Sequence, residues 1–268
     1  MAQLKGPIQF TGSLGNIRSY YNKHLKCYTV STKGGATKEQ INNSPSFART
    51  RENMSEFKAC GKWASQLRRS LLSIAHLHQG YYFGEIVALA KIIQKRDDDH
   101  PRGHRSIESS KAAWLLQNLN FNRDHPFDQV LSNQIEVSFS EDKKTVTFKT
   151  LGFKSFSRLN WPNGYDWFRV VLVIAQIPDH EWNEKENCYK PLYMNMEQLA
   201  VSTFSEWFPR STEPRDIIQS ASFAHPALQQ PGTTVIVAVG VEVISSAMGS
   251  SAMNSTGSGT MKIVQCFV

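Results

Sequence analysis

The chain has 268 residues, of which 40% are hydrophobic and 20% are charged, a composition typical of globular proteins. The net charge of +7 is uneven, because residues 1–75 hold 12 Lys and Arg against 3 Asp and Glu. No apolar run reaches the roughly 18–20 residues that a membrane-spanning helix needs. Residues 1–7 lack the apolar core of a secretory signal, and the four cysteines form no CxxC pair. These features predict a cytoplasmic protein without a membrane span, and they leave open a later place in an exported or virion-like particle.

Residues 1–43 have the pattern of an N-terminal β segment. Apolar and polar residues alternate loosely between glycines, which predicts two or three short strands, at residues 8–11, 17–21 and 26–30, with a turn at residues 13–16. Because an isolated hairpin is marginally stable in water, we expect this segment to lie on the rest of the chain or on a neighbouring copy. The side chains proposed for self-association are Ile8, Phe10, Ile17, Tyr20 and Tyr21.

Residues 44–125 are predicted to form a helical domain. Ser44 can cap a helix whose first turn accommodates Pro45. We expect two more helices, at residues 82–95 and 106–119, and a small antiparallel bundle of about three helices. The apolar stripe of the first helix recurs at spacings of three and four and comprises Met54, Phe57, Cys60, Ala64, Leu67, Leu71 and Ile74.

From residue 133 to residue 268 the apolar period changes to two, which is typical of strands. A hairpin is expected around residues 135–150, and the run at 167–177 is apolar on both faces and predicts a central strand. Further strands are expected at 191–200, 217–223, 233–244 and 260–268. Short strands without intervening helices favour an antiparallel β-sandwich. The predicted fold class is therefore α+β, with an N-terminal hairpin, a small helical bundle and a C-terminal sandwich.

Sequence motifs for catalysis are absent. No phosphate-binding glycine loop, HExxH or GxSxG is present, and the cysteines stand among apolar residues. We therefore expect no enzyme and no cofactor. The second alternative, after nucleic-acid binding, is a metal-dependent hydrolase at the loop from Asp97 to His104. Groups that can ligate a divalent ion are carried there by Asp97, Asp98, Asp99, His100 and His104.

The basic first quarter suggests the first alternative, nucleic-acid binding. Tyrosines interleave with cations around residues 20–28, where they could stack bases and hold phosphates. A solvated basic face and aromatic packing within a sheet explain the same pattern. The cations proposed to contact nucleic acid are Lys23, Lys26, Arg68 and Arg69.

Several short motifs together carry a family resemblance. They are Lys5-Gly6, the Gly12–Gly15 turn, Lys33-Gly34-Gly35, Phe47-Ala-Arg-Thr-Arg-Glu-Asn53 with Glu56-Phe57, and later Arg102-Gly103-His-Arg105 and Leu119-Asn-Phe-Asn122. The set resembles an uncharacterised family of Bacteroidetes-type bacterial proteins of unknown function. The resemblance implies one architecture, in which such an N-terminal segment precedes an immunoglobulin-like sandwich, and it carries no catalytic residues.

The first functional hypothesis is a non-enzymatic structural or scaffold protein. Its N-terminal strands would pair with a sheet edge of a neighbouring copy, giving a homo-oligomer, a filament or a particle-like assembly. Other structural proteins of such an assembly are further partners in this hypothesis.

Overall fold

In the computed structural model, the fold is α+β and the chain forms two compact units, Met1–Arg51 and Glu52–Val268. The residues described are 2–3, 6, 9–32, 34–80, 82–151, 159–161, 165–210, 216–227, 230–244 and 259–268. The helices of the segment predicted as a helical domain at 44–125 share a hydrophobic core with the C-terminal strands. None of the described helices combines the length and apolar character required to cross a membrane.

The first unit contains a four-stranded antiparallel sheet in the order β1-β4-β3-β2. A turn at Gly15, whose φ of 56° suits glycine, joins β2 to β3. The short helix α1 follows, and its N-terminus is closed by reciprocal hydrogen bonds between Thr37 and Gln40. The elements are β1 (Ala2–Gln3), β2 (Gly12–Leu14), β3 (Ile17–Asn22), β4 (Cys27–Thr32), α1 (Lys38–Asn43) and the 3-10 turn η1 (Pro45–Phe47).

The first strand differs from its predicted position. We expected it at residues 8–11, whereas β2 occupies Gly12–Leu14 and residues 9–11 precede it. Ile8 lies outside the described residues. The strand β3 pairs with β2 on one side and with β4 on the other, so it is not an edge. Pairing of β3 with a neighbour's sheet edge, as we first expected, is therefore wrong.

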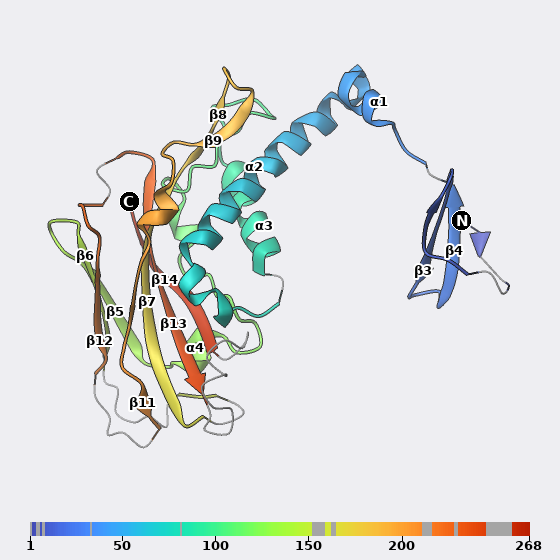
Figure 1. Ribbon diagram of the computed structural model, residues 1–268. Helices are drawn as coiled ribbons and strands as arrows, with labels where there is room; N and C mark the ends of the chain where they lie inside the picture. The colour runs from blue at the N-terminus through green and yellow to red at the C-terminus, as the bar shows by residue number, and fades with distance from the viewer. Residues whose placement is uncertain are drawn as a thin grey trace. The chain divides into compact units, whose positions relative to one another are not determined.

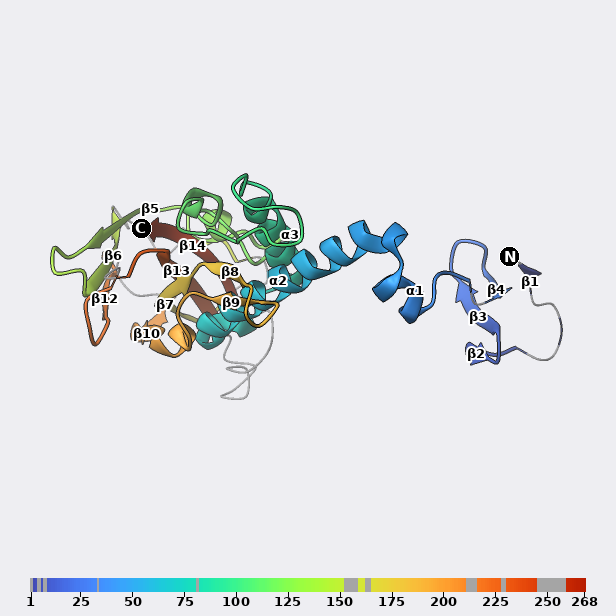
Figure 2. The same cartoon turned by 90° about the horizontal axis from the view of Figure 1, so that it is seen from above.

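The second unit has three layers, which Figures 1 and 2 both show side by side. Helices cover one face of a central sheet of order β10-β7-β13-β14, to which β11 adds, and a smaller sheet of order β12-β6-β5 lies on the other face. The strands are β5 (Gln134–Phe139), β6 (Thr145–Leu151), β7 (Trp167–Pro178), β10 (Val201–Phe204), β11 (Phe208–Pro209), β12 (Ile218–Ser222), β13 (Thr233–Ile244) and β14 (Gly259–Phe267).

The alternation of side chains along β7 explains the central layer. Val171 and Val173 face the helices, whereas Val170 and Leu172 face the smaller sheet. Each of these side chains is almost fully buried, as expected for a strand that is apolar on both faces. The prediction of a central strand at 167–177 is confirmed, and β5, β6, β12, β13 and β14 also match their predicted positions closely.

Two of the predicted helices are present and the third is absent. The first is α2 (Ala48–Ser70), followed by the 3-10 turn η2 (Leu72–Leu77), and the second is α3 (Tyr82–Gln94). The turn η2 packs directly against the central sheet because Gly240 of β13 has no side chain. A Cβ at Gly240 would lie only 2.6 Å from Cδ1 of Leu77. On α2 the buried side includes Trp63 and Leu67, whereas Met54 and Phe57, expected in the apolar stripe, are exposed.

The segment predicted as a third helix, at 106–119, is a loop containing the 3-10 turn η3 (Ala113–Leu115). Its end runs along the outer edge of β14, where Asn118 N–H donates to Ile263 and Phe121 N–H donates to Met261. The buried Asp179 accepts hydrogen bonds from Ser109 and Ser110 and thereby fixes the loop to the end of β7. These long-range backbone bonds replace those that a helix would make.

Other elements connect the layers. The hairpin of β8 (His180–Asn183) and β9 (Cys188–Pro191) follows β7, and the 3-10 turn η5 (Met196–Leu199) precedes β10. The strand expected at 191–200 is absent from this described range: β9 ends at residue 191, η5 lies within this range, and β10 begins at residue 201. A short helix, α4 (Phe127–Val130), leads into β5.

Candidate functional site

The N-terminal sheet separates apolar from polar side chains by face. The pairing register places Leu14 opposite Ile17, and Tyr21 opposite Tyr28. Because side chains alternate across a strand, these residues share one face, together with Val30, which is opposite Ser19. We call Leu14, Ile17, Tyr21, Tyr28 and Val30 the N-terminal apolar face.

Much of this face is open to solvent. Leu14 is 70% exposed, Ile17 is 43% exposed and Tyr21 is 48% exposed. The edge of the Tyr21 ring meets Tyr28, with the ring centroids 5.2 Å apart. Among the described residues of this unit, only Ser19 and Thr29 are buried, and no buried apolar side chain accompanies them. The sheet therefore has no hydrophobic core of its own within the described residues, which leaves it marginal in isolation.

The opposite face is polar. It presents Arg18 and Tyr20, and the Arg18 guanidinium lies 5.9 Å from the centre of the Tyr20 ring. Of the residues proposed for self-association, Ile17 and Tyr21 thus lie on the N-terminal apolar face, Tyr20 lies on the other side, and Phe10 precedes β2 in a half-buried position. Leu14 was missed because its role depends on the register between β2 and β3.

The cations proposed for nucleic-acid binding are divided between the two units. Lys23 and Lys26 lie in the exposed turn between β3 and β4 of the first unit. Arg68 and Arg69 lie in the last turn of α2 in the second unit, where both are exposed. Each pair is accessible to solvent within its own unit.

The loop at 97–104 is organised by hydrogen bonds rather than as a metal centre. The buried Asp97 carboxylate accepts from the N–H groups of Asp99, His100 and Ser106 and pairs with the His100 ring at 2.8 Å. Burial raises the pKa of Asp97, but these hydrogen bonds outweigh it and hold the pKa below its ordinary value.

The other candidate metal ligands of that loop do not converge on one point. Asp98 and Asp99 are exposed, and the His104 ring stacks on Trp182 with centroids 4.2 Å apart. Within the described part of the chain, no group of three or more His, Cys, Asp or Glu side chains is placed to hold an ion. The geometry of Asp97–His104 therefore gives no support to the hydrolase alternative.

Two thiols are poor nucleophiles for a physical reason. Burial raises the pKa of Cys60 to about 11 and that of Cys266 to about 12. Because the thiolate is the reactive form, neither group is activated near neutral pH. The Cys60 thiol instead donates to Gln94 at 3.4 Å inside the core.

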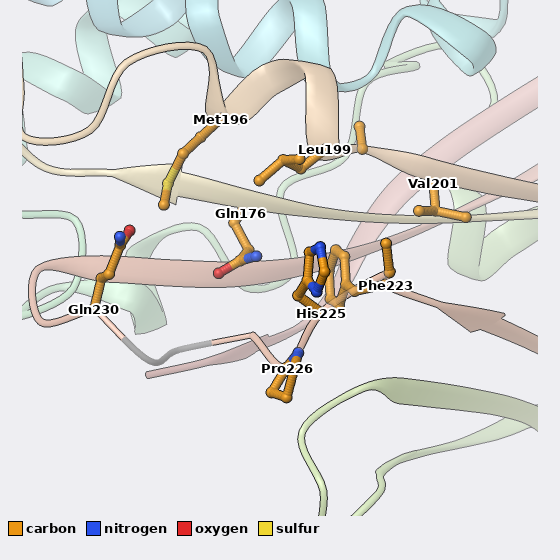
Figure 3. Close-up of a pocket in the computed structure, with 10 residues that line it drawn as sticks. Gln176, Met196, Leu199, Val201, Phe223, His225, Pro226 and Gln230 are labelled. Atoms are coloured by element: carbon orange, nitrogen blue, oxygen red, sulfur yellow. The ribbon is translucent and has the colours of Figure 1, made fainter.

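A pocket of about 310 Å³ lies at one end of the space between the sheets (Figure 3). Gln176 projects from β7 toward it, with Met196 and Leu199 on one side and His225 on the other. The volume is at the lower limit of small-molecule sites. Its walls are mostly apolar, and Gln176 already interacts within the protein, so the pocket does not specify a ligand class.

A larger hollow lies between α2 and the hairpin β8–β9, where two adjoining pockets measure about 350 and 670 Å³. They share Lys58, Lys62, Cys188 and Tyr189. Sequence reasoning missed this region because it assigned Met54 and Phe57 to a buried stripe and expected no hairpin at 180–191.

The comparisons with known proteins add no relative, since no protein-family model, curated protein or solved structure matches the chain.

Proposed function

We propose that the protein is a non-enzymatic structural or scaffold protein that self-associates through its N-terminal apolar face. The observation that carries this proposal is the exposure of Leu14, Ile17 and Tyr21 on a sheet whose described residues bury no apolar side chain. In this proposal the second unit is the rigid body of the assembly. Its two β layers are an immunoglobulin-like sandwich, supported by antiparallel sheets that share one hydrophobic cluster.

Burial of the N-terminal apolar face in a contact would contribute enough free energy to stabilise the N-terminal sheet. Fully covering a large apolar side chain contributes about 1.5–3 kcal/mol. Roughly half of each of Leu14, Ile17 and Tyr21 is still exposed, so covering all three contributes about 2–5 kcal/mol per copy. Two copies facing each other contribute twice that, less the cost of association. This is comparable with the whole stability of a small domain, so a partner decides whether the sheet is firmly folded.

A second copy can be the partner because the contacting face itself carries no charge. The first unit is basic, with eight Lys and Arg against one Glu in residues 1–51. The N-terminal apolar face, however, carries no charged residue at its described positions, because Arg18 lies on the other side and Lys23 and Lys26 lie in a turn. Two such faces can therefore meet without opposing like charges, as an isologous contact requires.

Face-to-face contact alone closes as a dimer. A filament or a particle-like assembly needs a second contact, and the outer edge of β2 offers backbone groups for one. The proposal therefore has two levels: pairing through the face and extension through the edge.

Two double substitutions on the same strand test the proposal. Ile17→Ser with Tyr21→Ser removes apolar side chains from the N-terminal apolar face, whereas Arg18→Ser with Tyr20→Ser alters the opposite face. We expect the first variant to have the monomer mass of 30.3 kDa by light scattering after size exclusion, and the second to keep the mass of the unaltered protein. Equal behaviour of the two variants would contradict the proposal.

A further inference from the structure

The hollow beside α2 is one continuous surface, which we call the α2–hairpin groove. Figures 1 and 2 both show the hairpin β8–β9 alongside α2. The groove lies entirely within the second unit, and its shared wall is formed by Lys58 and Lys62 of α2 and by Cys188 and Tyr189 of β9. From Met54 to Arg69 it follows α2 for about 22 Å, at about 1.5 Å per residue.

The lining of the groove is cationic. Lys58, Lys62, Arg69 and Lys190 contribute to it, and no Asp or Glu does among the side chains that the structure describes. The Lys62 ammonium is held in place by a 3.0 Å hydrogen bond to the Tyr189 carbonyl oxygen. Lys190 pairs with Glu186, whereas Lys58 is exposed. The groove therefore complements an anionic partner.

The groove is also unusually apolar for a solvent-facing surface. Met54 is 58% exposed, Phe57 is 64% exposed and Met194 is 68% exposed. Large apolar side chains gathered in one exposed depression indicate an interaction site. Methionine adapts its shape to different apolar partners and is common on such surfaces.

We propose that the α2–hairpin groove binds an acidic peptide segment in an extended conformation, with carboxylates on its cations and apolar side chains against Phe57 and the two methionines. The spacing supports this occupant. Lys58 and Lys62 are about 6 Å apart along the helix axis, close to the rise of about 6.6 Å over two residues of an extended chain. Acidic residues at alternate positions would thus face successive lysines, and about seven residues would fill the groove.

Two other occupants fit less well. The N-terminal unit of a second copy is itself strongly basic, so it would be repelled by the groove lysines. Single-stranded nucleic acid needs aromatic ring faces on which its bases can stack. Phe57 offers one exposed ring. Trp182, however, already stacks on His104 and meets Tyr189 at its edge, and the methionines have no ring, so a run of successive bases finds few ring faces here.

The test uses a fluorescein-labelled peptide of about eight residues, in which Glu alternates with Leu and Phe, titrated with the full chain by fluorescence anisotropy. We expect saturable binding that weakens about tenfold when Gln replaces every Glu in the peptide. Lys58→Glu is expected to weaken binding about tenfold by charge repulsion, and Phe57→Ser by a similar factor through lost apolar contact. Both side chains are exposed, so both variants keep the fold.

Arg68→Glu is the matched control, because Arg68 is an exposed cation of the same helix that does not line the groove. We expect it to change peptide affinity by less than about twofold. Three results would overturn the proposal: no saturable binding of the Glu peptide, equal loss for Arg68→Glu and Lys58→Glu, or tighter Lys58-dependent binding of an oligothymidylate than of the peptide.

Discussion

Replacing Trp63 by alanine is expected to lower the free energy of unfolding of the second unit by about 3–5 kcal/mol. Trp63 is fully buried on the inner side of α2, in the hydrophobic cluster that joins the helices to β7 and β13. Its removal leaves a cavity that the packed side chains around it fill only in part. For a unit of this size the loss corresponds to a fall in melting temperature of about 10 °C.

The measurement is urea unfolding followed by far-ultraviolet circular dichroism. Phe57→Ala is the control, since Phe57 is exposed on the same helix and its loss should change stability by less than about 0.5 kcal/mol. Trp63→Phe should cost less than Trp63→Ala, because phenylalanine fills most of the site and the indole N–H has no hydrogen-bond partner among the described residues. Equal stabilities of Trp63→Ala and Phe57→Ala would show that α2 does not share the core.

The second large effect is expected at Glu242 on β13. Its carboxylate is 5% exposed, pairs with His76 at 2.7 Å and contacts the Arg169 guanidinium. The Arg169 guanidinium carbon in turn lies over the rings of Phe204 and Trp207, 4.5 and 4.6 Å from their centres. Glu242→Gln would remove the negative charge that balances this guanidinium. We expect the free energy of unfolding to fall by about 3 kcal/mol.

The same residue predicts a pH dependence. Burial raises the pKa of Glu242, but hydrogen bonds and charges from His76 and Arg169 outweigh it, and the pKa lies below its ordinary value of 4.5. A carboxyl whose pKa is lowered in the folded state stabilises the protein above the unfolded pKa, and this contribution is lost as pH falls through the folded pKa. The stability difference between the unaltered protein and Glu242→Gln should therefore be full above about pH 5 and shrink below pH 4.5.

Calorimetry from pH 3 to pH 7 would measure this difference. Glu85→Gln provides the control, because Glu85 and its partner Arg123 are a more exposed pair that contributes at most about 1 kcal/mol. A Glu242→Gln variant whose deficit stayed constant down to pH 3 would show that the carboxylate does not titrate as this network requires.

The strands of the second unit were predictable because their signals are local. The doubly apolar run of β7 and the alternation in β5 and β6 follow directly from burial on two faces or on one. The helix α3 was predicted at nearly its full length for the same reason, because its apolar residues recur at helical spacing within one short segment.

Features that depend on distant partners were not predictable. The segment at 106–119 has helical spacing, yet its backbone bonds to β14 and its serines bond to Asp179. Phe57 fits the apolar stripe of α2, but the helix turns Glu56 inward, where Lys91 and Gly103 N–H satisfy it. Likewise Leu14 joins the N-terminal apolar face only through the register of β2 with β3.

The central claim is that copies of the chain associate through the N-terminal apolar face, and the mass of the unaltered protein in solution tests it most directly. Light scattering after size exclusion would be run at low and at high salt. Because the proposed contact is apolar, we expect a multiple of 30.3 kDa at both salt concentrations. A mass of 30.3 kDa at both would contradict the claim, and an assembly that dissociates as salt rises would show that charge, rather than this face, holds the copies together.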